Sequence, residues 1–364
     1  MSSTTLEQPV RDVMSAGERP SAAIVAGAPF ELLIGLFALT NEPRSERTWP
    51  PRSLDAASDR VRAAVERLGP RSGELWLHLL GTALEAPAGI DAAAFVERLA
   101  ELDAHELRRH LLGVHVPAWR EVVGVDTLER AAAGDRSAQT RLLADERYYG
   151  GEAAAALRVI LPLSAATTKR RVLGALRAFV EDVFGPQEAS VMRTLEHEAS
   201  ARRPLARTSS AEQLVAAVVP GYVYVPEPEL PHVVLVPHLA ARPWMLLCQH
   251  KSTRLICYAV QPASGRPDQD LRRRALELGR ALGDAQRLRI LERLRNRPAN
   301  LSELAAEAGV AKSTAHHHLA HLRTAGLVEV RGNARSYTYS LRSEGLAESR
   351  LLLGRLLAPL SESD

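Results

Sequence analysis

The chain has 364 residues, of which 46% are hydrophobic and 4% aromatic, and its formal net charge is +3. That length can bury the cores of two or three domains, and the recurrent Ala, Leu and Arg suit a mostly helical protein. Cys248 and Cys257 do not form a CxxC pair, so neither a disulfide framework nor a thiolate metal cluster is expected. No apolar run reaches about 18 residues and no signal-peptide pattern opens the chain, so we expect a cytoplasmic protein.

The N-terminal part is expected to be a large helical domain preceded by disorder. Residues 1–22 are small and polar with Pro9, Gly17 and Pro20, and such a composition favours disorder. We then predict a helical domain over 23–262. Its expected helices cover 30–39, 54–68, 74–84, two segments within 91–113, 126–133, 137–148, 151–161, 166–183 and 186–202.

Four short β-type segments close this domain. They are Tyr222–Val225, Val233–Val236, Met245–Cys248 and Leu255–Val260, with prolines between the first ones. We predict that they form a small antiparallel sheet. Gln261–Pro267 (QPASGRP) is the expected linker to the next domain.

Catalytic signatures in the N-terminal domain are incomplete. His197-Glu198 begins an HExxH pattern, but Ala201 stands where its second histidine would be. The histidines at 78, 105, 110 and 115 are interpreted as chance scatter among the 12 in the chain. We find no GxGxxG, no GxxxxGK[ST] and no GxSxG, so we do not expect an enzyme.

The second expected domain covers 263–345, and within it the segment 281–341 reads as three helices followed by a two-stranded ribbon. The first of the three begins after Asp284, an N-cap residue, and stops near Arg297-Pro298. The second begins after Asn300, with Glu303 placed to complete a capping box, and ends at Gly309. Only two residues separate it from the third helix, which is the spacing of a helix-turn-helix.

The third helix has an apolar face and a small polar face. Ala315, Leu319 and Leu322 share the face predicted to be buried. The opposite face is expected to hold Ser313, His317, Ala320 and Thr324, with His316 and His321 on its flanks. A polar face that starts in the first turn is typical of a helix that reads the major groove of double-stranded DNA.

The ribbon that follows is predicted to be a wing. Leu327–Arg331 and Arg335–Leu341 read as strands joined by a turn at Gly332-Asn333. Arg331 and Arg335 would lie at its tip, where a wing touches the DNA backbone or minor groove. From Asp268 to Glu344 there are 14 Lys/Arg and 9 Asp/Glu, so the basic surplus of the chain is concentrated here, as phosphate binding requires.

These patterns together resemble the ArsR/SmtB family of winged helix-turn-helix transcription regulators. The resemblance lies in LGDAQRLRILERL, in LSELAAEAGVAKSTAHHHLAHLRTAGLV and in VRGNARSYTY, about a fifth of the chain. It implies DNA contacts by Lys312, Ser313, Thr314, His316 and His317, and by Arg335 in the wing. The chain departs from the family at the recognition-helix N-cap, where it has Ala311 in place of the usual serine, so the helix could start about a residue later.

Two apolar helices flank this unit. Leu271, Ala275, Leu278 and Leu282 form a stripe before it, and the predicted C-terminal helix within 346–364 repeats the pattern with Leu353, Leu356, Leu357 and Leu360. The resemblance implies a homodimer through these helices. The alternative is that they pack on the N-terminal domain of the same chain.

A metal signal is not expected. The family's usual cysteine positions read LSELAAEAGV here, and the last helix has no histidine. His317 and His321 are spaced as a possible zinc pair, but a DNA-reading face is the better interpretation. We therefore expect no bound metal and no cofactor.

The fold class expected is mainly α (α+β). Our functional prediction is a homodimeric repressor whose N-terminal domain senses a non-metal small molecule or a partner. Apolar helices such as 30–39 and 74–84 favour a hollow for an apolar effector. The alternative is an N-terminal scaffold or undetected enzyme, with the winged helix used for protein contact.

Overall fold

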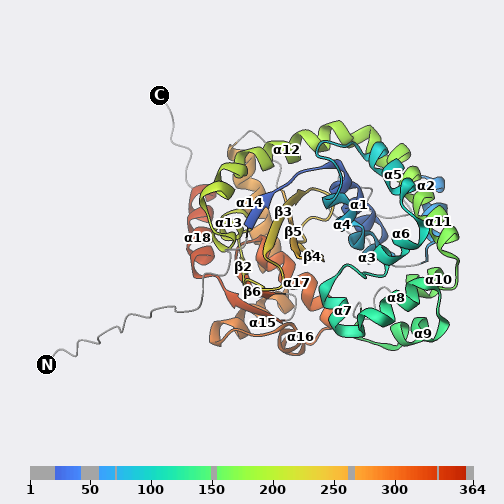
Figure 1. Ribbon diagram of the computed structural model, residues 1–364. Helices are drawn as coiled ribbons and strands as arrows, with labels where there is room; N and C mark the ends of the chain where they lie inside the picture. The colour runs from blue at the N-terminus through green and yellow to red at the C-terminus, as the bar shows by residue number, and fades with distance from the viewer. Residues whose placement is uncertain are drawn as a thin grey trace, which may run out of the picture.

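The computed structural model describes residues 21–41, 57–69, 72–148, 154–260, 267–333 and 336–357, and it is mainly helical (Figure 1). The following sequence predictions fall wholly or partly outside these ranges: the disorder of residues 1–20, the first residues of the helices expected at 54–68 and 151–161, the linker at 261–266, the position of Arg335, and Leu360 with the rest of 358–364. Among the described helices, none combines the length and apolar character needed to cross a membrane.

The N-terminal region is built around one buried helix. α1 (Ala28–Thr40) has every residue from Ala28 to Leu39 buried, as its uniformly apolar sequence predicts. The remaining helices up to residue 148 are α2 (Asp59–Glu66), α3 (Gly73–His78), α4 (Leu80–Leu84), α5 (Ala92–Glu101), α6 (Ala104–Leu111), α7 (Pro117–Val123), α8 (Val125–Ala133) and α9 (Arg136–Ala144). They are followed by α10 (Ala154–Ile160), α11 (Ala165–Phe179), the π-helical turn Val180–Phe184, α12 (Gly185–Thr208) and α13 (Ala211–Val218).

Two of these helices were not expected from the sequence. α7 begins with Pro117 in its first turn, where proline's fixed φ suits a helix start. α13 begins after Ser210, whose side chain forms a capping box with Gln213. Both helices therefore have a local start signal in the sequence. They are too short for their apolar periodicity to indicate a helix by itself.

The sheet of the N-terminal region is mixed, so the prediction of an antiparallel sheet is wrong. Its strands are β1 (Ser21–Ile24), β3 (His232–His238), β5 (Thr253–Ala259) and β4 (Leu246–His250), in that spatial order. β3 pairs in parallel with both β1 and β5, and only β4 and β5 form an antiparallel hairpin. The central strand β3 is buried along most of its length, as parallel strands covered on both faces are.

The first strand also corrects the N-terminal boundary. Ser21 and Ala22 belong to β1 and not to a disordered segment ending at residue 22. Ser21 N–H donates to the Pro231 carbonyl at 2.9 Å, and the strand runs beside β3, more than 200 residues later in the chain. The sequence of a short segment does not indicate a strand partner so far along the chain.

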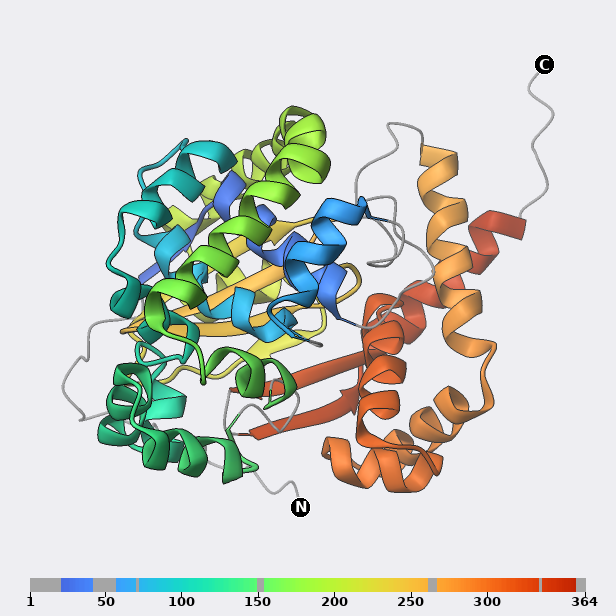
Figure 2. The same cartoon turned by 90° about the vertical axis from the view of Figure 1, so that its right-hand side faces the viewer.

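The C-terminal region has the predicted order of elements. It contains α14 (Pro267–Leu282), α15 (Ala285–Asn296), α16 (Leu301–Ala308), α17 (Lys312–Thr324), β6 (Val328–Asn333), β7 (Ser336–Leu341) and α18 (Ser343–Leu357). Figure 2 shows this region, in orange and red, to one side of the N-terminal region. α14 and α18 lie side by side at its outer edge.

The two regions share a sheet. β2 (Tyr222–Tyr224), predicted to join the N-terminal sheet, instead pairs in parallel with β6 of the wing, and β7 completes the order β2-β6-β7. Val330 N–H donates to the Gly221 carbonyl at 2.9 Å, and the Tyr222 hydroxyl donates to the Gly332 carbonyl at 3.1 Å. The wing is thus hydrogen-bonded to the N-terminal region along one edge.

Candidate nucleic-acid interface

α15 and α16, the two helices before α17, begin and end where the sequence indicates. Asp284 Oδ1 accepts from the Arg287 backbone N–H at 3.0 Å, and α15 ends at Asn296. Asn300 and Glu303 form the full capping box of α16, with bonds of 2.9 and 3.0 Å. Gly309 takes the left-handed conformation at φ 67°, which turns the chain toward the next helix.

The next helix, α17, presents an exposed N-terminal turn. It begins at Lys312, directly after Ala311, whose side chain makes no capping hydrogen bond. Lys312, Ser313 and Thr314 are exposed. The first backbone amides of a helix lack intrahelical partners, so an uncapped start leaves donors for a phosphate group, beside the Lys312 charge.

The opposite side of α17 is anchored in the core. Ala315, Leu319 and Leu322 are buried, as their spacing predicts. His318 lies between this side and α15: its Nδ1 is 3.9 Å from Asp284 Oδ1, and its side chain is 12% exposed. Burial lowers the pKa of His318, and the Asp284 carboxylate only partly opposes that effect. His318 is therefore a packing residue, whereas His316 is exposed.

Part of the predicted DNA-reading face lies against the N-terminal region. The ring centroid of Trp244 lies 4.9 Å from that of His316 and 4.9 Å from that of His317, which is half-buried. Ala320, one turn further along, is only 6% exposed, so the prediction that it faces outward is wrong in this conformation. The segment before β4 thus contacts part of the side of α17 that the sequence assigns to the groove, at His316 and His317.

A hydrogen bond closes the same contact near the end of α17. Arg323 Nη2 donates to the Pro243 carbonyl at 3.1 Å. Burial lowers the pKa of Arg323 to about 10, which leaves the guanidinium charged at neutral pH. A charged donor held on a carbonyl makes this a stronger contact than a neutral hydrogen bond of the same length.

The wing is a hairpin, as predicted, but its turn is not at Gly332-Asn333: both residues belong to β6, where they pair with Tyr337 and Ser336 of β7. Arg331 is exposed on β6, and Arg335 is outside the described residues. On β7, Tyr339 is buried and Thr338 is exposed, the alternation expected of a strand with one face on the core. Tyr339 also exchanges backbone hydrogen bonds of 2.8 and 3.0 Å with Ala299, which ties the wing to the start of α16.

The comparisons with known proteins agree with this geometry. Residues 284–330 match the family described as "Bacterial regulatory protein, arsR family". The C-terminal unit is an arsR-family helix-turn-helix domain. The arsR domain makes the protein a DNA-binding transcription regulator. No match was found among curated proteins.

Solved structures similar to the arsR domain cover about a quarter of the chain. NolR from Sinorhizobium fredii is 27% identical over 27% of this chain and 97% of its own, with a TM-score of 0.21. Reduced HlyU from Vibrio cholerae is 32% identical over 25% of this chain and 95% of its own, with a TM-score of 0.20. The transcriptional repressor BigR from Xylella fastidiosa is 25% identical over 26% of this chain and 98% of its own, with a TM-score of 0.19.

The predicted DNA contacts within the described residues differ in their exposure. Lys312, Ser313, Thr314, His316 and Arg331 are exposed, and His317 is partly covered. Trp244 and Pro243 are the residues that sequence reasoning missed. No periodicity relates this loop to a helix some 70 residues later, because the contact arises from tertiary packing alone.

Proposed function

We propose that the protein is a homodimeric transcription repressor whose N-terminal region controls access of the recognition helix to DNA. One observation carries the proposal: Trp244 packs against His316 and His317, two residues expected to read bases. A helix covered in this way cannot lie fully in the major groove. The conformation described here is then the one with low affinity for DNA. The proposal assigns no catalytic role to the N-terminal region.

A cavity between the two regions supports control by a small molecule. It measures about 770 Å³ and is bordered by residues of α3, of α7, of β4 and of the wing strand β7. That volume is within the usual range for a small-molecule site. The sequence favoured helices 30–39 and 74–84 as walls. Glu74, Leu77 and His78 do line the cavity, whereas α1 does not.

The cavity is lined by polar groups of the N-terminal region and by one residue of the wing. Arg254 and Glu227 form a buried ion pair there, with Arg254 Nη2 2.6 and 2.7 Å from the two carboxylate oxygens. Tyr337, from β7 of the wing, borders the same space. A ligand that touches both sides would stabilise or loosen the shared β2-β6 edge. Coupling requires that it bind the covered and uncovered states with different affinity.

The homodimer within this proposal is supported by α14 and α18. Leu276, Leu351 and Leu357 are 60%, 69% and 77% exposed. A concave surface borders Ala275, Leu276, Gly279 and Leu356 on the same two helices. The alternative was that these helices pack on the N-terminal region of their own chain. In the single chain, however, these leucines remain exposed to solvent. A second copy would bury them.

The experiment is to uncover the recognition helix. Trp244→Ala should raise the affinity for operator DNA about 5-fold or more, since coupling of 1–3 kcal/mol is typical. Trp244→Phe keeps an aromatic ring against the histidines and serves as the matched control. Affinity is measured by fluorescence anisotropy on full-length protein, with folding checked by circular dichroism. A folded Trp244→Ala protein with unchanged or weaker binding would rule out this form of control.

A further inference from the structure

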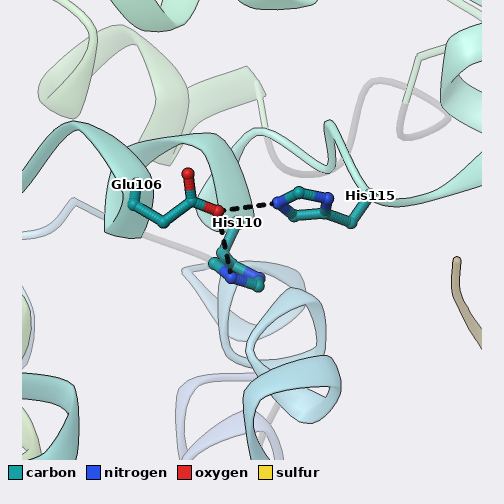
Figure 3. Close-up of side chains that lie close together, drawn as sticks. All are labelled: Glu106, His110 and His115. Carbon is teal, nitrogen blue, oxygen red and sulfur yellow. Dashed lines mark hydrogen bonds and ion pairs between the residues drawn. The ribbon is translucent and has the colours of Figure 1, made fainter. Parts of the chain in front are cut away.

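A second group of residues, far from the recognition helix, has the composition of a metal site. Glu106 and His110 are four residues apart on α6, which places them on one face of that helix. His115 follows the helix and turns back toward them. The sequence analysis interpreted these histidines as chance scatter, but Figure 3 shows one oxygen of the Glu106 carboxylate directed at both imidazole rings.

The three ligand atoms are already close enough to share one ion. Glu106 Oε1 lies 2.9 Å from His115 Nε2 and 3.6 Å from His110 Nε2. One potential ligand atom from each of the three residues lies within 4.8 Å of the others. Ligands held about 2.1 Å from a tetrahedral Zn²⁺ are roughly 3.4 Å apart, so small side-chain adjustments suffice.

The environment of His110 is unusual for a packing residue. Its side chain is 5% exposed, and its Nδ1 has no hydrogen-bond partner among the described residues. Its Nε2, 3.6 Å from the carboxylate, is too distant for a hydrogen bond. The Nε2 atom of this buried imidazole thus faces a carboxylate without a hydrogen bond to it, and a cation bound there would give Nε2 a ligand bond.

The carboxylate is oriented by groups behind it. Arg109 Nη1 donates to Glu106 Oε2 at 2.6 Å, which leaves Oε1 directed at the imidazoles. Arg109 is itself fixed by two hydrogen bonds to Glu129, at 2.9 and 2.7 Å. Such outer partners hold a ligand in position and are typical of metal sites.

His250, at the end of β4, lies beside the group. Its ring stacks on that of His110 with centroids 5.8 Å apart and an interplanar angle of 15°. Its Nε2 is 2.8 Å from Glu85 Oε1, so it is engaged by a second carboxylate. Its ring also lies close against Gly81, where an added Cβ would fall 2.0 Å from Nδ1. His250 therefore forms the wall of the site and is not counted as a ligand.

We propose that Glu106, His110 and His115 bind one divalent transition-metal ion, with Zn²⁺ the ion that best fits two imidazoles and a carboxylate. Three protein ligands leave a fourth position open to water or another small ligand. The ion would fix His115, whose carbonyl accepts from Lys251 N–H at 2.8 Å and which precedes the Val116–Trp119 wall of the cavity. Its role is to order the connection between α6 and α7.

The test uses full-length protein stripped with a chelator and titrated with Zn²⁺ alone. We expect one Zn²⁺ per chain, counted by mass spectrometry of the metal, and an affinity read by competition with a chromophoric zinc indicator. Glu106→Gln and His115→Ala should each weaken binding at least about 10-fold. His105→Ala, on the same helix but outside the group, should bind as wild type. Co²⁺ should give the visible absorption of a tetrahedral site.

Other outcomes would overturn the site. Absence of stoichiometric binding, or equal binding by wild type and Glu106→Gln, would mean that the group is only a hydrogen-bonded cluster. Binding that survives in Glu106→Gln but is lost in His317→Ala would place the metal on the recognition helix instead. Glu106→Gln is nearly isosteric, so it decides the question even if His115→Ala does not fold.

Discussion

Arg331 is the residue that lets the wing's contribution to DNA binding be measured. It is exposed on β6, next to the part of the hairpin where the wing is expected to approach the DNA. Arg331→Ala should lower affinity for all sequences alike and reduce the slope of log affinity against log salt by about one. The matched control is Arg193→Ala, an exposed arginine on α12. Equal salt slopes for wild type and Arg331→Ala would remove the wing from the interface.

His238 is hydrogen-bonded to the loop that contacts the recognition helix, and its protonation should change the stability of the fold with pH. Its Nδ1 accepts from Ala241 N–H at 3.4 Å, so its Nε2 carries the proton donated to the Trp244 carbonyl at 3.1 Å. Burial lowers the pKa of His238 to about 3, although the hydrogen bond to Trp244 opposes that effect. An unfolded histidine has a pKa near 6.5, so below that pH the unfolded chain takes up the proton first.

Stability should therefore fall as pH decreases from about 6.5 toward 3. This single group contributes up to about 1.4 kcal/mol per pH unit to the loss of unfolding free energy. The His238→Gln variant should show a smaller change of unfolding free energy with pH, equivalent to the uptake of up to one proton fewer on unfolding. This holds whatever the substitution does to stability at pH 7. Urea denaturation between pH 5 and 7.5 measures the slope. An unchanged slope would mean that His238 is hydrated in solution.

Single residues were predicted best where the signal is local. The Asn300 cap with Glu303, the Asp284 cap and the left-handed Gly309 each act within four residues, and each is confirmed. Ala320 was assigned to the wrong surroundings because the helical period gives its face but not what covers that face. The Glu106 group was missed in part because His115 lies beyond the end of α6, where the helical period no longer applies.

At the scale of elements, exposed leucines on the paired helices α14 and α18 allow the proposed dimer to be tested by substitution. Leu276→Glu and Leu357→Glu place a charge on leucines that are 60% and 77% exposed, so neither change disturbs the core of the monomer. Each should convert a dimer to a monomer, as read by light scattering, with unchanged thermal unfolding of the monomer. Leu205→Glu, at a 36% exposed leucine on α12, is the control. A wild-type protein that is itself monomeric at micromolar concentration would contradict the dimer.

Helices were foreseen more reliably than strand partners. α1 follows from its apolar run, and α15 to α17 follow from periodicity, with caps at the starts of α15 and α16; a single segment contains all of these signals. β1 and β2 pair with strands far along the chain, and their choice depends on what the whole fold leaves unpaired. Short segments such as Tyr222–Tyr224 fit either sheet on composition, so the sequence indicates a strand without naming its neighbour.

For the whole molecule, the N-terminal region and the arsR domain are joined by two separate contacts. One is the β2-β6 edge, and the other is Trp244 with Pro243 on α17. The cavity bordered by Tyr337 and Arg254 lies between the same regions. A change in the N-terminal region can therefore reach both the wing and the recognition helix, the two parts of the domain that contact DNA in our account.

The most direct test of this account is selection of binding sites from random duplex DNA by full-length protein, with wild type and His317→Ala compared side by side. Wild type should enrich an inverted repeat whose half-site centres lie about 10 bp, or a larger helical multiple, apart. His317→Ala should change the preferred bases within each half-site and keep the spacing, because the dimer is untouched. Enrichment of the same bases by both proteins would contradict DNA reading by the polar face of α17.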